Sequence, residues 1–108
     1  MARITIIMPV YNGEKYIRQA IDSILNQTFK DWKLLCIDDC SSDNSVKIIQ
    51  SYDDDRIELI CNDKNRGIAF SRNVGLENAQ TEYIALLDDD DIAMPYRLEK
   101  EIEYLDAH

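Results

Sequence analysis

The sequence lacks the features that mark secreted, membrane-spanning and nucleic-acid-binding proteins. Its three cysteines, Cys36, Cys40 and Cys61, have neither disulfide-framework nor metal-site spacing, so we expect reduced thiols in a cytoplasmic protein. No apolar run approaches the roughly 18 residues of a membrane helix, and the first residues carry no small-residue cleavage site. The net charge of −9 opposes binding to nucleic acids and anionic membranes. We therefore expect a soluble chain that binds neither.

Glycine and proline are also scarce, with three and two among 108 residues. Together with 45% hydrophobic residues, this composition excludes a disordered or fibrous chain and predicts a protein rich in regular structure. The length suits one compact domain and is too short for two. We interpret residues 1–108 as a single domain, because no repeat, linker or change in composition divides them.

Strand and helix patterns alternate four times along the chain. Apolar runs predict strands at residues 3–10, 33–38, 56–61 and 82–87. Apolar residues at helical spacing predict helices at about residues 14–27, 45–52 and 68–79, and a last one that begins near Pro95. This alternation predicts an α/β fold with a Rossmann-like parallel sheet, in the order 3-2-1-4, flanked by helices on both faces. Trp32, Cys36 and Cys61 are expected to pack in its core.

A polar loop follows each predicted strand. The loops read PVYNGE, DDCSSD, NDKNRG and DDDD. The carboxyl ends of parallel strands meet at one edge of a sheet, and open α/β sheets bind their ligands there, next to the point where the strand order reverses. We therefore expect a ligand site between the first and fourth strands.

The loop after the fourth strand contains four consecutive aspartates, residues 88–91. Clustered carboxylates suit Mg²⁺ or Mn²⁺, but these residues alone fit equally well a solvated turn that caps the last helix. An EF-hand is excluded, because Ile92 and Ala93 stand where its loop needs an oxygen ligand and a glycine. The usual glycine-rich phosphate loops are absent, so phosphates bound here would need a metal ion.

Four segments in this order make a more specific pattern. They are MPVYNGEKYI, IDDCSSDNS, NRGIAFSRNVGLENA and EYIALLDDDDIAMP. Together they resemble the family 2 glycosyltransferases over essentially the whole chain. The resemblance implies the nucleotide-binding half of a GT-A fold, which binds a nucleoside diphosphate sugar, most often a UDP-sugar, with Mn²⁺ or Mg²⁺. The full-length enzyme would transfer the sugar, with inversion, to a hydroxyl of a glycan or lipid-linked acceptor, in the cytoplasm or at the inner membrane face.

The same resemblance implies roles for individual residues. The expected contacts to the nucleotide sugar are Pro9, Val10, Tyr11, Glu14, Asp39, Arg72, Asp88 and Asp89. The Asp39 carboxylate would accept a hydrogen bond from a uracil N–H, and Arg72 would serve base or phosphate oxygens. Asp38 would support the loop. The best metal ligand is Asp90, with Asp88 as the alternative, and four identical residues leave this register open by one.

The resemblance also implies what the chain does not supply. In this family the acceptor site and the general base lie downstream of the aspartates, and here the base is expected beyond His108. His108 is the only histidine and is not expected to act in the site. Glu99, Glu101 and Glu103 are expected to be solvated, so no catalytic residue is identified.

We therefore expect a donor-binding domain truncated from a longer enzyme and inactive alone, whose last strand leaves an edge open to a homo-oligomer. The alternative is a non-catalytic, transferase-like interaction module. A phosphoacceptor receiver domain is disfavoured, because Cys61-Asn62-Asp63 does not match its single aspartate.

Overall fold

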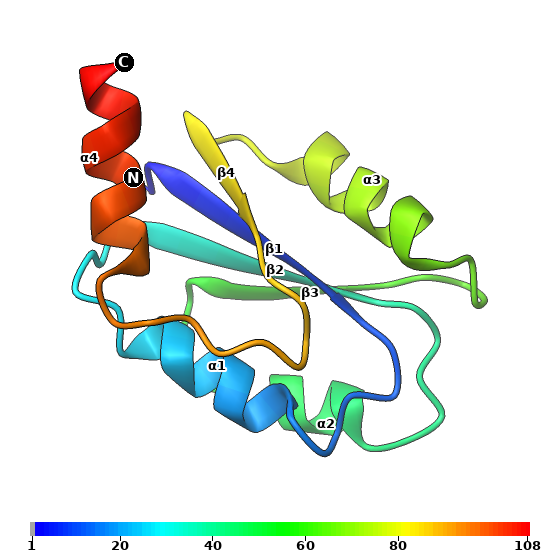
Figure 1. The fold of residues 1–108 in the computed structure, drawn as a ribbon. Coiled ribbons are helices and arrows are strands. Elements are labelled where there is room, and N and C mark those ends of the chain that lie inside the picture. Colours follow the sequence, from blue (N-terminus) through cyan, green and yellow to red (C-terminus); the bar gives the residue numbers. More distant parts are fainter. Residues whose placement is uncertain (1) are drawn as a thin grey trace.

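Strands and helices alternate along residues 2–108, the part of the chain that the computed structural model describes (Figure 1). The strands are β1 (Ile4–Val10), β2 (Trp32–Asp38), β3 (Ile57–Cys61) and β4 (Tyr83–Leu86). The helices are α1 (Ile17–Leu25), α2 (Ser45–Gln50), α3 (Ile68–Asn78) and α4 (Arg97–Ala107). The eight elements follow one another in the predicted order.

The strands form one parallel sheet in the order β3-β2-β1-β4, which confirms the predicted topology. The central strand β1 pairs with β2 along its whole length, from Ile4 opposite Trp32 to Val10 opposite Asp38. Its pairing with β4 stops earlier, at Ile7 opposite Leu86. The chain therefore leaves the sheet after β4 while β1 continues, and this opens a space beside the end of β1.

Helices cover both faces of the sheet, as predicted (Figure 1). Every residue of β1 is buried, which explains its nearly continuous apolar sequence, and the hydroxyl of its one polar residue, Thr5, is hydrogen-bonded to that of Thr81. Ile4, Ile6 and Met8 belong to a core cluster that also contains the apolar stripe of α1 and, from α4, Leu98 and Ile102. On the opposite face, α3 packs against β1 and β2. The core thus fixes the strand ends, from which the loops of the site extend.

Several element boundaries differ from the predictions. Helix α1 begins at Ile17 rather than near Glu14, because the preceding residues form a turn in which the Ile17 N–H donates to the Gly13 carbonyl at 2.8 Å. Helix α4 begins at Arg97, two residues after Pro95. Trp32 is the first residue of β2 rather than a residue before it. These shifts leave the predicted order and faces unchanged.

The prediction that Cys61 fills the core is wrong. Cys61 ends β3, which lies at one border of the sheet, and its side chain is exposed, whereas Cys36 in β2 is buried as expected. Burial raises the pKa of the Cys36 thiol to about 12. The difference follows from position, because β2 is covered on both faces and paired on both edges, and β3 is not.

The other border of the sheet is β4, where Ile84 and Leu86 are 42% and 45% exposed. Association of copies through this edge stays a prediction. Within the described residues, none of the helices is long and apolar enough to cross a membrane.

Candidate functional site

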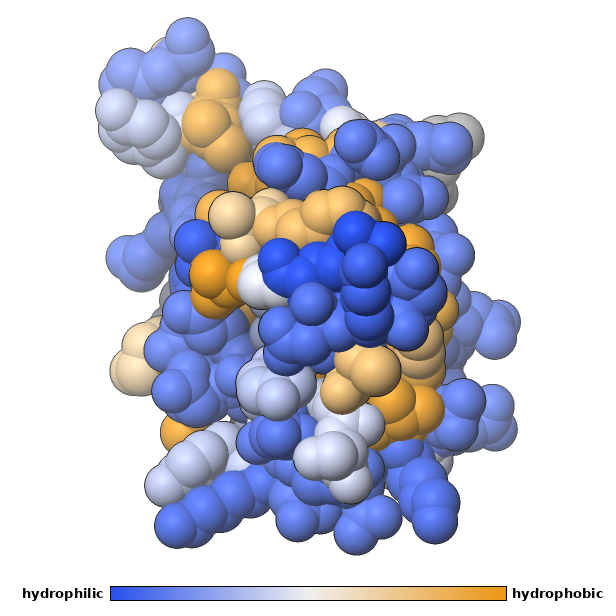
Figure 2. Space-filling view, turned by 90° about the vertical axis from the view of Figure 1, so that its right-hand side faces the viewer, coloured by the Kyte–Doolittle hydropathy of each residue, from blue (hydrophilic) through white to orange (hydrophobic). Residues whose placement is uncertain are grey.

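A pocket of about 460 Å³ opens at the carboxyl edge of the sheet, the edge where the four strands end. Its size lies in the usual range for small-molecule sites. It is lined by Pro9, Val10, Tyr11, Asp39, Asn65, Gly67, Ile68, Ser71, Asp88, Asp89 and Asp90. Figure 2, which looks from the right-hand side of Figure 1, shows hydrophobic side chains gathered in the middle of a largely hydrophilic face.

Most of the predicted site residues line this pocket. The exceptions are Glu14 and Arg72, while Asn65, Gly67, Ile68 and Ser71 are additions from the loop before α3 and from its first turns. Asn65 and Gly67 belong to the polar loop NDKNRG, which was expected at this edge, but no pattern singled them out within it. Ile68 and Ser71 lie in α3, and no sequence pattern placed them at the pocket.

Asp39 lies at the centre of one side of the pocket, and three donors converge on its carboxylate. Oδ1 accepts from the Asn62 side chain at 2.9 Å and from the Arg66 N–H at 2.8 Å, and Oδ2 accepts from the Gly67 N–H at 2.9 Å. Gly67 has φ +93°, a conformation that favours glycine. A carboxylate has about four acceptor positions, so Oδ2 keeps one for a ligand donor.

Burial alone would raise the pKa of Asp39, but the donors outweigh it. Hydrogen bonds from Arg66, Asn62 and Gly67 stabilise the charged form and hold the pKa below its ordinary value. Asp39 is therefore an ionised acceptor at neutral pH. Asn62, which also donates to the buried Ser71 hydroxyl at 3.0 Å, is the residue here that no sequence pattern identified.

Hydrogen bonds join the loop after β1 to the loop after β2. The Asn12 N–H donates to the Ser41 hydroxyl at 2.9 Å, and the Ser42 N–H donates to the Asn12 side chain at 2.8 Å. Asp38 accepts from the backbone N–H and hydroxyl of Ser41, at 3.0 and 2.6 Å, which is the supporting arrangement expected of it. This side of the pocket is therefore built from mutually satisfied polar groups.

Glu14 serves the same scaffold. Its carboxylate accepts from the Asn44 N–H at 3.0 Å, directly before α2, and its own N–H donates to Asp43 at 3.1 Å. A carboxylate at a helix N-terminus is stabilised by the free N–H groups and the helix dipole. Glu14 is therefore bonded to the start of α2 and does not line the pocket. Its predicted contact with the nucleotide sugar stays a prediction.

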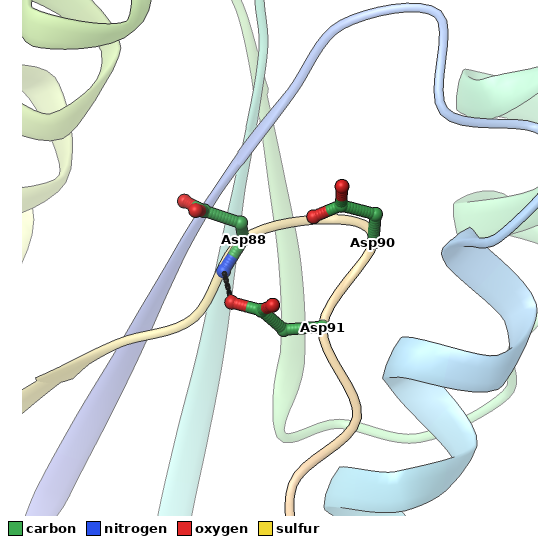
Figure 3. A group of neighbouring side chains, drawn as sticks. All are labelled: Asp88, Asp90 and Asp91. Atoms are coloured by element: carbon green, nitrogen blue, oxygen red, sulfur yellow. Dashed lines mark hydrogen bonds between the residues drawn. The ribbon is translucent and has the colours of Figure 1, made fainter.

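Residues 88–91, which we call the aspartate turn, lie at the other side of the pocket, where Asp88, Asp89 and Asp90 line it. Asp88, Asp90 and Asp91 each place one carboxylate oxygen within 4.8 Å of the others (Figure 3). The turn is closed by two bonds, from the Asp91 N–H to the Asp88 carbonyl at 3.1 Å and from the Asp88 N–H to the Asp91 carboxylate at 3.3 Å. Three hard oxygen donors at this separation fit a magnesium or manganese ion.

Asp91 was not among the predicted ligands, although it belongs to this cluster. Four identical residues carry no signal that distinguishes their directions, so only the backbone course of the turn could identify the members. Among residues 2–108, no N–H or O–H group donates to Asp90, whose carboxylate is left for solvent or a cation.

Asp89 points away from the cluster toward the loop after β1. Its Oδ2 accepts from the Tyr11 N–H at 3.1 Å, and a Cβ atom on Gly13 would lie only 2.5 Å from that oxygen. Burial raises the pKa of Asp89 above its ordinary value, and the charges of Asp90 and Asp88 add to this. Asp89 therefore connects the two sides of the pocket.

Arg72 projects from α3 toward the aspartate turn. Its Nη2 donates to Asp88 at 3.2 Å, and within the described chain its buried Nε has no acceptor. A buried donor without a partner is uncommon and favours a ligand or water at that position. The Arg72 guanidinium thus forms an ion pair with Asp88 and, within residues 2–108, keeps one N–H group, at Nε, free to donate to a ligand.

His108 lies directly after α4 and outside the pocket lining. Its exposed ring stacks on that of Tyr104, with the ring centroids 4.2 Å apart, and its Nδ1 donates to the Tyr104 carbonyl at 2.8 Å. These contacts join His108 to the preceding turn of the same helix, so it is not a candidate base for the site. The location of the general base beyond His108 stays a prediction.

The strand order, the pocket at the carboxyl edge and the acidic turn beside it define a doubly wound, Rossmann-like fold with its ligand site at the strand ends. The family model described as glycosyl transferase family 2 matches residues 5–108, and the chain belongs to this family.

Similar proteins agree with that assignment. A glycosyltransferase of Haemophilus influenzae is 45% identical over 97% of this chain and 43% of its own length. The Escherichia coli protein WfgD, named as a UDP-Glc:alpha-D-GlcNAc-diphosphoundecaprenol beta-1,3-glucosyltransferase, is 42% identical over 94% of this chain and 40% of its own length. The chain thus spans about two fifths of the length of these relatives.

Two solved structures show what similar folds bind. TarS of S. aureus, residues 1–349, in complex with UDP-GlcNAc has a TM-score of 0.93 and 29% identity, over 100% of this chain and 32% of that one. The mannosyltransferase PcManGT of Pyrobaculum calidifontis, in complex with GDP-Man and Mn²⁺, has a TM-score of 0.86 and 25% identity, over 95% of this chain and 32% of that one.

Proposed function

We propose that this chain binds the nucleoside diphosphate part of a sugar donor, with uracil as the base and a divalent cation on the diphosphate. The observation that carries the proposal is one pocket with an ionised, partly free Asp39 on one side and the aspartate turn on the other. UDP-GlcNAc in the complex of TarS, and GDP-Man with Mn²⁺ in that of PcManGT, support it.

Asp39 suits uracil because of its remaining acceptor position. The N3–H of uracil is a donor, whereas the N3 of cytosine is an acceptor that an ionised carboxylate would repel. Pro9, Val10 and Tyr11 bring the end of β1 to the same pocket, where they would line the base. Arg72 would donate to base or phosphate oxygens.

Asp88, Asp90 and Asp91 would hold Mn²⁺ or Mg²⁺, which supplies positive charge to the diphosphate when bound. Asp90 is the first candidate ligand, because no group of the described chain donates a hydrogen bond to its carboxylate. Asp88 is the second, because it already forms an ion pair with Arg72. Asp89 would position the turn through Tyr11 rather than bind the ion.

For the whole enzyme we propose transfer of the sugar to an acceptor hydroxyl, with inversion. The relatives, of whose length this chain spans about two fifths, support the proposal that residues 1–108 act as the donor-binding part of a longer transferase. Among the described residues, every carboxylate on the pocket lining is already assigned to binding the sugar donor and its cation or to holding the aspartate turn, and no histidine lies there. We therefore expect no sugar transfer by these residues alone.

Calorimetric titration with UDP tests the proposal. We expect binding in MnCl₂ and much weaker binding in EDTA, with the metal-dependent part lost in Asp90→Asn. The control Asp55→Asn removes the same charge from an exposed position outside the pocket and should bind like the original chain. Equal heats with and without Mn²⁺ would contradict the proposal and favour a non-catalytic interaction module.

A further inference from the structure

Gln27 is a fully buried polar side chain just beyond the end of α1. Its amide is completely engaged. Nε2 donates to the Met94 carbonyl at 2.7 Å and to the Ser23 carbonyl at 3.1 Å, while Oε1 accepts from the Leu98 N–H at 3.0 Å. Two of these three bonds reach the segment that directly follows the aspartate turn.

Neighbouring residues hold the same segment. The Ala93 N–H donates to the Ser23 hydroxyl at 3.0 Å, and the Thr28 N–H donates to the Pro95 carbonyl at 2.9 Å. Ala93 itself is buried, although Ile92 before it is exposed. The C-terminal end of α1 therefore forms an anchor for residues 93–98.

The aspartate turn thus lies between two fixed points. On its entry side, the Leu87 N–H donates to the Ile7 carbonyl at 3.1 Å, in continuation of the sheet. On its exit side, the anchor begins at Ala93. Like charges repel, so free carboxylates would separate, but the turn between these points keeps three of their oxygens within 4.8 Å.

We propose that Gln27 and Ser23 are positioning residues for the aspartate turn. They bind no ligand themselves; they hold the exit of the turn so that the carboxylates are assembled when the protein folds rather than when the cation arrives. Preorganisation of this kind raises affinity by reducing the ordering cost of binding. The inference rests on the proposed function, because it assigns these residues a role in binding the metal ion.

A purely structural role makes a different prediction. If Gln27 only secured α4, its replacement would lower stability but leave the metal affinity of the folded molecules unchanged. A positioning role lowers the affinity of the folded molecules as well. The comparison therefore needs a variant of similar stability whose substitution lies far from the turn, and Ile49→Ala, in the buried face of α2, provides one.

The test measures binding of Mn²⁺ alone, from the electron paramagnetic resonance of the free ion, at a temperature where each variant is folded. Gln27→Met keeps the side-chain length and removes all three bonds. We expect its Mn²⁺ affinity to fall about tenfold, the low end for residues that orient metal ligands, with a smaller fall for Ser23→Ala. Ile49→Ala should bind like the original chain.

Each outcome decides the inference. Mn²⁺ affinities of Gln27→Met and Ser23→Ala equal to that of Ile49→Ala would overturn it and leave the proposed function intact. If the original chain bound no Mn²⁺ alone but bound UDP in MnCl₂, the carboxylates would not be assembled in advance, and the inference would fall while the proposed function stood. If it bound neither Mn²⁺ nor UDP, both would fall. If Gln27→Met did not fold, Ser23→Ala would decide alone, because it removes one hydroxyl and leaves little empty space.

Discussion

The two sides of the pocket satisfy their carboxylates in opposite ways. Around Asp39, three donors converge on one carboxylate and lower its pKa. In the aspartate turn, the carboxylates of Asp88, Asp90 and Asp91 lie together, Asp90 has no donor in the described chain, and the pKa of the neighbouring Asp89 is raised. The charge of Asp39 is stabilised by hydrogen bonds within the protein, whereas the clustered charges of the aspartate turn need a cation to offset their repulsion. We infer that base recognition and diphosphate binding differ in their dependence on metal.

The largest expected effect is that of Asp39→Ala, which removes the acceptor of three donors. A hydrogen bond to a charged group contributes roughly 1.5 kcal/mol or more, and the three donors are only partly buried, so we expect the free energy of unfolding to fall by about 3 kcal/mol. Urea denaturation measures this, with and without Mn²⁺. A loss no larger than that of the exposed control Asp55→Asn would show that the Asp39 side is not built as described.

Gly13→Ala should disturb the connection between the two sides. The new Cβ would approach Asp89 Oδ2 to 2.5 Å and displace the carboxylate from the Tyr11 N–H. Because the end of the Asp89 side chain can turn aside, the cost is chiefly the lost bond from the Tyr11 N–H to a charged group, and we expect the free energy of unfolding to fall by about 1.5 kcal/mol. The double variant Gly13→Ala/Asp89→Ala should recover part of this loss, and strict additivity of the two changes would contradict the contact.

Asp89→Asn should have a smaller effect of opposite sign. Because the pKa of Asp89 is raised in the folded state, the folded protein binds the proton more tightly, and stability falls as pH rises from the unfolded pKa through the folded one. Asparagine removes this penalty and can still accept from Tyr11.

At pH 7 we therefore expect Asp89→Asn to be more stable by up to about 1 kcal/mol, with the gain absent at pH 3. Asp39 has a lowered pKa, so its stabilisation is present at neutral pH and is lost as pH falls through the folded value. Thermal unfolding of Asp89→Asn and of Asp39→Ala, each compared with the original chain between pH 3 and pH 7, measures both trends. A destabilised Asp89→Asn at pH 7 would contradict the raised pKa.

Much of the fold could be predicted, because periodicity and strand–helix alternation reflect burial directly. The sheet order and the helical stripe of α1 agreed with expectation. The burial of Cys61 did not, although the predicted order already places its strand at the border, because an apolar run does not reveal how much of a border strand the helices leave uncovered. Helix ends also shifted, because they depend on local bonds such as that from Ile17 to Gly13.

The site was predictable in its location and less so in its contacts. The position of the polar loops placed Asp39 and the aspartates at one edge, and the pocket contains them. The separate directions of Asp89 and Asp91, the amide of Asn62 on Asp39, and the anchoring by Gln27 depend on the folded course of several segments. No pattern within one segment encodes contacts of this kind.

The difference between the two sides of the pocket is tested most directly by titrating uridine and UDP, each in MnCl₂ and in EDTA. Uridine reaches only the Asp39 side, so we expect its affinity to be the same in both solutions. UDP also reaches the aspartate turn, so we expect it to bind more tightly than uridine only when Mn²⁺ is present. Tighter binding of UDP in EDTA, or uridine binding that needs Mn²⁺, would contradict the account.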